Sequence, residues 1–150
     1  GLVRESHIIS QGSQDLTLSA SRALNIPVAQ AEEWKRRFGL GPTNGITETQ
    51  ASLADSLQLS LSPLVSEISR TVAAYETRMN QSISELVLTG GGAGLKGLQD
   101  FAQKNISTPV RLADPFAKTQ APAFLEQILK EAGPEFSVAV GLALRRLQEV

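Results

Sequence analysis

The spacing of apolar and polar residues predicts three elements in the N-terminal part of the chain. Residues 2–10 are rich in β-branched side chains and are typical of a strand. Apolar positions at helical spacing then predict a short helix that ends before Pro27, because a proline disfavours helical geometry in the residue before it. A second helix is expected over residues 28–38, with Gly39 as its stop signal.

The middle of the chain predicts a loop and two longer helices. Residues 39–46 contain Gly-Pro and Asn-Gly turn signals and are the best candidate for a joint between subdomains. Thr47, with glutamine three residues later, forms a capping box and predicts a helix over residues 47–59. Pro63 is expected to start a new amphipathic helix, which runs to about residue 80.

The period of the apolar pattern changes near residue 84. Residues 84–89 form a short, mainly apolar segment of strand length, and three glycines follow it directly. A helix is then expected over residues 95–104. Residues 108–112 have the composition of a second short strand. The order strand, glycine turn, helix, strand predicts a parallel pair joined by a crossover.

Two more helices are expected at the C-terminal end. Pro122 begins the first, and the pair at residues 133–134, Gly-Pro, separates it from a last helix over residues 135–148. Residues 138–144 are apolar on nearly every side, which predicts that the last helix lies between other elements.

Composition and charge narrow the classes of function. The chain has 150 residues, no cysteine, one histidine and a net charge of -1. A chain without cysteine holds no disulfide, thiolate metal site or cysteine nucleophile, and it fits a reducing cytosol. The neutral charge and 5% aromatic residues give no basic surface for nucleic acid. No apolar run approaches the roughly 20 residues of a membrane span, so no membrane insertion is expected.

The glycine-rich turn at residues 89–97 is the strongest chemical signal. Glycines between a strand and a helix let backbone approach a ligand closely, and the same pattern also serves as a tight packing turn. A Rossmann dinucleotide site would require an acidic residue after the second strand, for which Asp114 is the only candidate. We assign no catalytic role to Asp114, to Glu135 or to His7, and no metal site is predicted.

Several motifs in the correct order resemble the PilM family of actin-like, cytoplasmic type IV pilus assembly proteins, and more loosely its cell-division relative FtsA. They are Leu-Val-Leu-Thr-Gly-Gly-Gly-Ala at 86–93, Leu-Lys-Gly-Leu at 95–98, Asp-Pro-Phe at 114–116 and a helix with Val-Gly-Leu-Ala at 134–145. Upstream, Ala-Glu-Glu-Trp-Lys at 31–35 resembles an Ala-Glu-x-x-Lys helix of that family. The resemblance extends over nearly the whole chain and implies the C-terminal half of such a protein.

The resemblance implies a partial actin-like, ribonuclease H-like α/β fold with a few-stranded mixed sheet. Residues 1–19 and 83–150 would form the residual large subdomain, and residues 20–82 a small helical subdomain. In that fold residues 2–10 lack neighbouring strands. We therefore expect them to re-dock on residues 84–89, to pair with another chain or to be poorly ordered.

The resemblance also implies where ATP or ADP would contact the chain. The matching positions for adenosine are Gly90, Gly91, Gly92, Glu32 and Lys35. Glu32 can accept hydrogen bonds from ribose hydroxyls, and Lys35, three residues later on the same side of a helix, can lie along a purine face. A solvated charged surface is the alternative reading of these helix residues.

The implied role is the adenosine-side half of an ATP-binding protein that scaffolds the cytoplasmic face of the type IV pilus assembly platform. The phosphate loops, the Mg²⁺-positioning carboxylates and the groove for the partner PilN are expected in an N-terminal half that precedes this chain, so we expect no ATP hydrolysis by the chain alone. It would reach the inner membrane through partners, with self-association as a further possibility. A scaffold that binds no nucleotide and a small Rossmann-type enzyme are the alternative functions.

Overall fold

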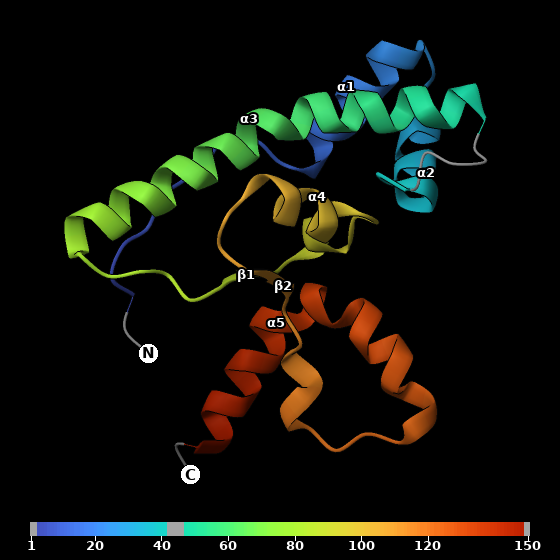
Figure 1. The fold of residues 1–150 in the computed structure, drawn as a ribbon. Helices are drawn as coiled ribbons and strands as arrows, with labels where there is room; N and C mark the ends of the chain where they lie inside the picture. The colour runs from blue at the N-terminus through green and yellow to red at the C-terminus, as the bar shows by residue number, and fades with distance from the viewer. Residues whose placement is uncertain (1–2, 42–46, 149–150) are drawn as a thin grey trace.

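The computed structural model describes residues 3–41 and 47–148, and its longest element is helix α3 (Glu48–Met79). Figure 1 shows α3 spanning the molecule, with α1 (Ser13–Leu24) and α2 (Val28–Phe38) against its N-terminal part. Below it lie a two-stranded sheet and, farther away, the C-terminal helix. The remaining elements are β1 (Leu86–Leu88), η1 (Gly91–Gly94), α4 (Leu98–Asn105), β2 (Val110–Leu112), η2 (Pro115–Lys118), η3 (Ala123–Leu125) and α5 (Glu126–Gln148).

The two short helices begin and end close to the predicted positions. Asn25 ends α1 in the left-handed conformation, with φ of 50°, and Pro27 is the N-cap of α2. Gly39 ends α2 with φ of 58°, a value that glycine adopts without strain. The capping box at Thr47 is present, because its hydroxyl accepts a hydrogen bond from the backbone of Gln50.

The predicted break before Pro63 is wrong, because α3 continues through it without interruption. The ring of Pro63 is exposed and removes the hydrogen bond that the carbonyl of Leu59 would receive. Leu59 is itself 76% exposed, so water can reach this side of the helix. The opposite side carries Leu57, Leu61 and Val65 into the core and holds the helix together.

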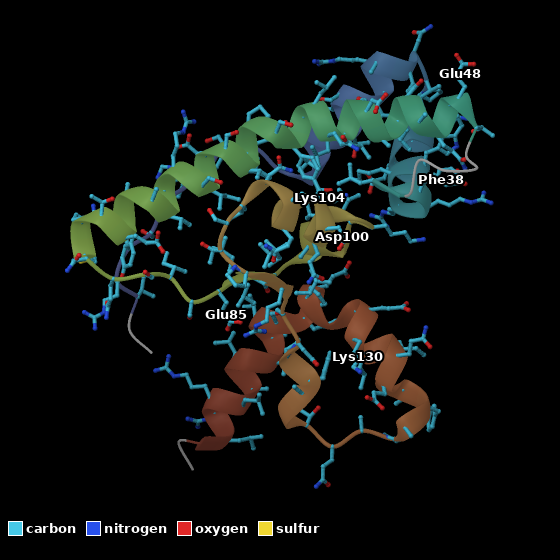
Figure 2. All side chains as sticks on the ribbon, viewed as in Figure 1. Phe38, Glu48, Glu85, Asp100, Lys104 and Lys130 are labelled. Atoms are coloured by element: carbon cyan, nitrogen blue, oxygen red, sulfur yellow. The ribbon has the colours of Figure 1, made fainter. Side chains whose placement is uncertain are left out.

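The predicted parallel strand pair is confirmed. β1 pairs with β2 in parallel, with Leu86 opposite Val110 and Leu88 opposite Leu112. Beside the sheet, Arg111 forms a two-pronged ion pair with Glu85, at 2.6 and 2.9 Å; Figure 2 labels Glu85. Within the described residues these two strands make up the whole sheet, so it is parallel rather than mixed.

The predicted strand at residues 2–10 is wrong for the described part, residues 3–10, which pair with no strand. The segment does not re-dock on β1 but runs beside α3 (Figure 1). Side chains attach it there: His7 lies 3.2 Å from Glu67 of α3 and Glu5 pairs with Arg78. An extended segment becomes a strand only where a neighbouring strand offers backbone hydrogen bonds.

Among the described residues, buried side chains form two core clusters, and α3 contributes to both. The first joins α1 and α2 to the N-terminal half of α3, and the second joins the C-terminal half to α4 and β2. Their buried members are Leu16, Ala20, Ala31, Leu40, Leu53, Leu57 and Leu61 in the first, and Val65, Ala102, Ile106 and Val110 in the second.

Helix α5 differs from its prediction in two ways. It is continuous through Gly133 and Pro134, although Figure 1 shows a sharp bend between its orange and red parts, as expected near a proline. It is also not enclosed, because Val138 and Leu142 are 72% and 63% exposed. Its principal contacts within the described structure are with η1, η2 and η3.

Two further predictions concern domain organisation and membranes. Residues 42–46 of the predicted joint lie outside the described residues, and the predicted boundary between residues 19 and 20 falls inside α1, so this division stays a prediction. In the described part of the chain, no helix combines the length and apolar character that crossing a membrane requires.

Candidate functional site

A cavity of about 750 Å³ lies where α1 and α2 face the glycine turn and the bend of α5. This volume is within the range of small-molecule sites. Four segments that are distant in the sequence supply its walls. The lining residues are Ser13, Gln14, Thr17 and Leu18 of α1, Val28, Ala29, Glu32, Lys35 and Arg36 of α2, Gly91, Gly92, Gly94 and Leu95 of the glycine turn, and Glu135 of α5.

The structure brings four of the five predicted site residues to this cavity. Glu32 and Lys35 line it from α2, and Gly91 and Gly92 line it from the glycine turn. Gly90 is outside the lining, and its N–H donates to the carbonyl of Pro134 at 2.7 Å.

Glu32 is held by hydrogen bonds to both of its carboxylate oxygens. Its Oε2 accepts from the hydroxyl of Thr17 at 2.5 Å and from the ammonium group of Lys35 at 2.7 Å, and its Oε1 accepts from Nε of Arg36 at 2.7 Å. The hydrogen bonds from Lys35 first, then from Thr17 and to a lesser extent from Arg36, lower the pKa of Glu32 from 4.5 to about 2, against an opposing effect of burial that exceeds the contribution of Arg36. Glu32 is therefore a fixed, ionised acceptor in the cavity wall.

Lys35 is the buried centre of this network, with only 4% of its surface exposed. Besides Glu32, its ammonium group lies 3.1 Å from the carbonyl oxygen of Ser13, 2.7 Å from the hydroxyl of Ser13 and 2.8 Å from that of Thr17. The lysine thus joins the first turn of α1 to α2 and orients Glu32. A contact between Lys35 and adenosine stays a prediction.

The lowered pKa of Glu32 predicts a pH dependence of stability. The folded chain binds this proton less readily than the unfolded chain, so the stabilisation is complete above about pH 4.5 and disappears as the pH falls toward 2. At pH 6, we expect Glu32→Gln to lower the free energy of unfolding by about 2 kcal/mol, after allowing for the partial exposure of the carboxylate. Urea titrations of both proteins should show this gap narrowing by more than half by about pH 3; a gap independent of pH would contradict the assignment.

The glycine turn has open surface on its cavity side. A Cβ atom added to Gly92 or to Gly94 would meet no other atom within 4 Å. Packing within the described structure therefore does not explain glycine at these two positions, and a molecule in the cavity could approach the bare backbone closely.

The turn is connected to the end of α2 by a close backbone contact. The N–H of Leu40 donates to the carbonyl of Lys96 at 2.8 Å, and the ammonium group of Lys96 lies 2.9 Å from the carbonyl oxygen of Arg37. Gly39 and Gly97 lie at this crossing, and a Cβ on Gly39 would be 2.5 Å from the carbonyl oxygen of Lys96. This α2–turn junction sets the spacing of two cavity walls.

Several lining residues were not assigned to a site from the sequence. One is Thr17, whose hydroxyl donates a hydrogen bond to Glu32. The others are Arg36 and Glu135, which line the cavity and are exposed. Spacing within one helix would have suggested Arg36, four residues after Glu32. No local pattern points to Glu135, because its relation to the cavity depends on the bend of α5. Asp114 does not line the cavity.

Acidic and histidine side chains do not gather into a candidate metal site within residues 3–41 and 47–148. We derive no step that involves Mg²⁺.

Comparison with protein families gives a match over almost the whole chain. The family model described as type IV pilus assembly protein PilM matches residues 6–147. Cell division protein FtsA from two strains of Helicobacter pylori is 34% identical over 164 aligned positions, which cover 95% of this chain and 32% of each relative.

A solved structure is similar as well. A chain of a PilM-PilN type IV pilus biogenesis complex superposes with a TM-score of 0.69 and 28% identity, over 88% of this chain and 36% of that one. The present chain thus spans about a third of the length of these proteins. The matches to both PilM and FtsA confirm the expected partial actin-like α/β fold.

Proposed function

The chain belongs to the PilM family of type IV pilus assembly proteins, and from this we propose that its cavity binds the adenosine part of ATP or ADP. The observation that supports the proposal best is that Glu32 and the glycine turn line the same cavity. These were the segments that the sequence resemblance implied for adenosine.

The chemistry of the walls suits a nucleoside. Leu18, Val28 and Leu95 give the cavity an apolar surface on which a planar base can lie. Glu32 is an ionised acceptor, and ribose hydroxyls are donors that such an acceptor prefers. The bare backbone at Gly92 and Gly94 leaves room for close approach. Together these walls fit a ligand with one flat apolar part and one hydroxylated part.

We further propose that the protein acts at the cytoplasmic face of the type IV pilus assembly platform as a scaffold whose partners include PilN. Support for this comes from the family match and from the similarity to a chain of a PilM-PilN complex. ATP hydrolysis and Mg²⁺ binding are not assigned to the described residues.

Nucleoside binding can be tested by titrating the chain with adenosine and following amide signals by NMR. We expect shifts at Gly91 and Gly92, and we expect Glu32→Ala to weaken adenosine binding about tenfold, because a charge-assisted hydrogen bond is lost. Glu33→Ala is the matched control, since Glu33 is exposed on the same helix but does not line the cavity. Equal affinities for Glu32→Ala and the control would contradict the proposed role of Glu32.

One observation favours a second candidate, a scaffold that binds no nucleotide. Both oxygens of Glu32 already have partners within the chain, namely Thr17, Lys35 and Arg36, so the carboxylate needs no ligand to be satisfied. Absence of any shift with millimolar adenosine, ADP or ATP would favour this scaffold over the nucleotide-binding protein.

A further inference from the structure

Glu135 is brought to the cavity by the glycine turn itself. The preceding residue, Pro134, is fully buried, and its carbonyl accepts hydrogen bonds from the N–H of Gly90 at 2.7 Å and from the hydroxyl of Thr89 at 3.3 Å. These bonds attach the bend of α5 to the turn. As a result, Oε1 of Glu135 would be 3.9 Å from a Cβ placed on Gly91.

The two carboxylates that line the cavity differ in their hydrogen bonding. Glu32 has three donors, whereas within the described part of the chain Glu135 accepts no hydrogen bond and forms no ion pair within 4 Å. Arg36, a cation in the same lining, is affected by the charge of Glu135. The pKa of Arg36 is raised, mainly by its hydrogen bond to Glu32 and then by the charges of Glu32 and Glu135. The described cavity lining therefore includes an acceptor without a hydrogen bond, Glu135, and a cationic donor on which its charge acts, Arg36.

This pair of groups matches the edge of an adenine base. A carboxylate is an acceptor only and a guanidinium is a donor only. Adenine carries an amino donor at C6 with ring-nitrogen acceptors on either side of it. Inosine carries an oxygen acceptor at the same carbon, which a carboxylate would repel, and purine riboside carries only hydrogen there.

We propose that Glu135 is a specificity-determining residue, whose carboxylate accepts a hydrogen bond from the 6-amino group of the base while Arg36 faces a ring nitrogen. This inference rests on the proposed nucleoside site and adds how the base is selected. It assigns the ribose side of the site to Glu32 of α2 and the base edge to Glu135 of α5.

The test compares adenosine, purine riboside and inosine on the 150-residue chain, with affinities from NMR titration. For the unsubstituted protein we expect adenosine to bind about tenfold more tightly than purine riboside, and inosine to bind more weakly still. In Glu135→Ala, adenosine and purine riboside should bind with similar affinity. In Glu135→Gln, whose amide can also donate, inosine should recover relative to adenosine.

Glu131→Ala is the matched control, because Glu131 is exposed on the same helix and does not line the cavity; it should keep the preference for adenosine. If adenosine binds but Glu135→Ala keeps the tenfold preference, the role of Glu135 is overturned and the nucleoside site stands. Tighter binding of guanosine than of adenosine would also overturn it. If none of the nucleosides binds to the unsubstituted chain, both proposals fail together.

Discussion

Replacing Lys35 by methionine is expected to lower the free energy of unfolding by about 3 kcal/mol, as measured by urea denaturation at neutral pH. Methionine fills a similar volume but offers no proton to Glu32, Thr17 or Ser13, all of which lie within hydrogen-bond distance of the ammonium group. Removing one partner of a buried charge network leaves the others poorly satisfied, which costs more than the loss of an exposed ion pair.

A double-mutant cycle separates the effect on Glu32 from a general packing defect. If Lys35 acts through Glu32, Lys35→Met should cost less when Glu32 is already glutamine, with a coupling of about 1 kcal/mol or more. Lys104→Met is the control, because this lysine, labelled in Figure 2 on α4, is exposed; its effect should stay within about 0.5 kcal/mol. Strict additivity in the cycle would mean that the lysine does not hold the carboxylate.

Gly39→Ala is expected to have a still larger effect, with a loss of about 4 kcal/mol or more. Gly39 has φ of 58°, and the added Cβ would lie 2.5 Å from the carbonyl oxygen of Lys96, which is backbone and cannot rotate away. The substitution therefore combines backbone strain with separation of the α2–turn junction. The midpoint of urea denaturation is the direct measurement.

Gly141→Ala is the matched control for this glycine substitution. Gly141 lies in α5, and a Cβ added there would meet no atom within 4 Å. Alanine favours helix over glycine, so this variant should gain up to about 1 kcal/mol. Similar losses in the two alanine variants would show that the junction at Gly39 carries no special constraint.

Local signals in the sequence predicted most element boundaries. Asn25 and Gly39 end their helices in the backbone conformations that such residues tolerate, and Thr47 begins α3 with its capping box. The glycine turn after the first short strand was also predicted, together with the parallel pairing of this strand with the second. In each case the residues that determine the boundary lie within a few positions of it.

The errors arose where distant contacts outweigh a local rule. Pro63 was expected to end a helix, but its ring faces solvent while Leu61 and Val65 hold the opposite side in the core. Residues 3–10 have the composition of a strand, yet strand formation depends on a neighbouring strand, which the composition of one segment does not reveal. The tendency of proline to break helices and the strand propensity of residues 3–10 are therefore weak guides to the structure in these two places.

The candidate site was predictable in part. The resemblance to a family placed Glu32 and the glycines together, which the structure brings to one cavity. The spacing of residues in the sequence could not have predicted that they lie together, because the whole of α3 separates α2 from the glycine turn along the chain. The burial of Lys35 depends on how α1 packs against α2, and the position of Glu135 depends on the bend of α5. Neither can be predicted from the spacing of residues along the sequence.

The α2–turn junction also has a consequence for the order of folding. Its contact between Lys96 and Arg37 joins residues 59 positions apart, and closing a loop of that length costs on the order of 3 to 4 kcal/mol in chain entropy. The α1–α2 pair can form from neighbours in the sequence, whereas the cavity is complete only after α3 has folded and the turn has reached α2. Loop closure therefore predicts that the cavity is completed late in folding, and pulsed hydrogen exchange during refolding would measure this order.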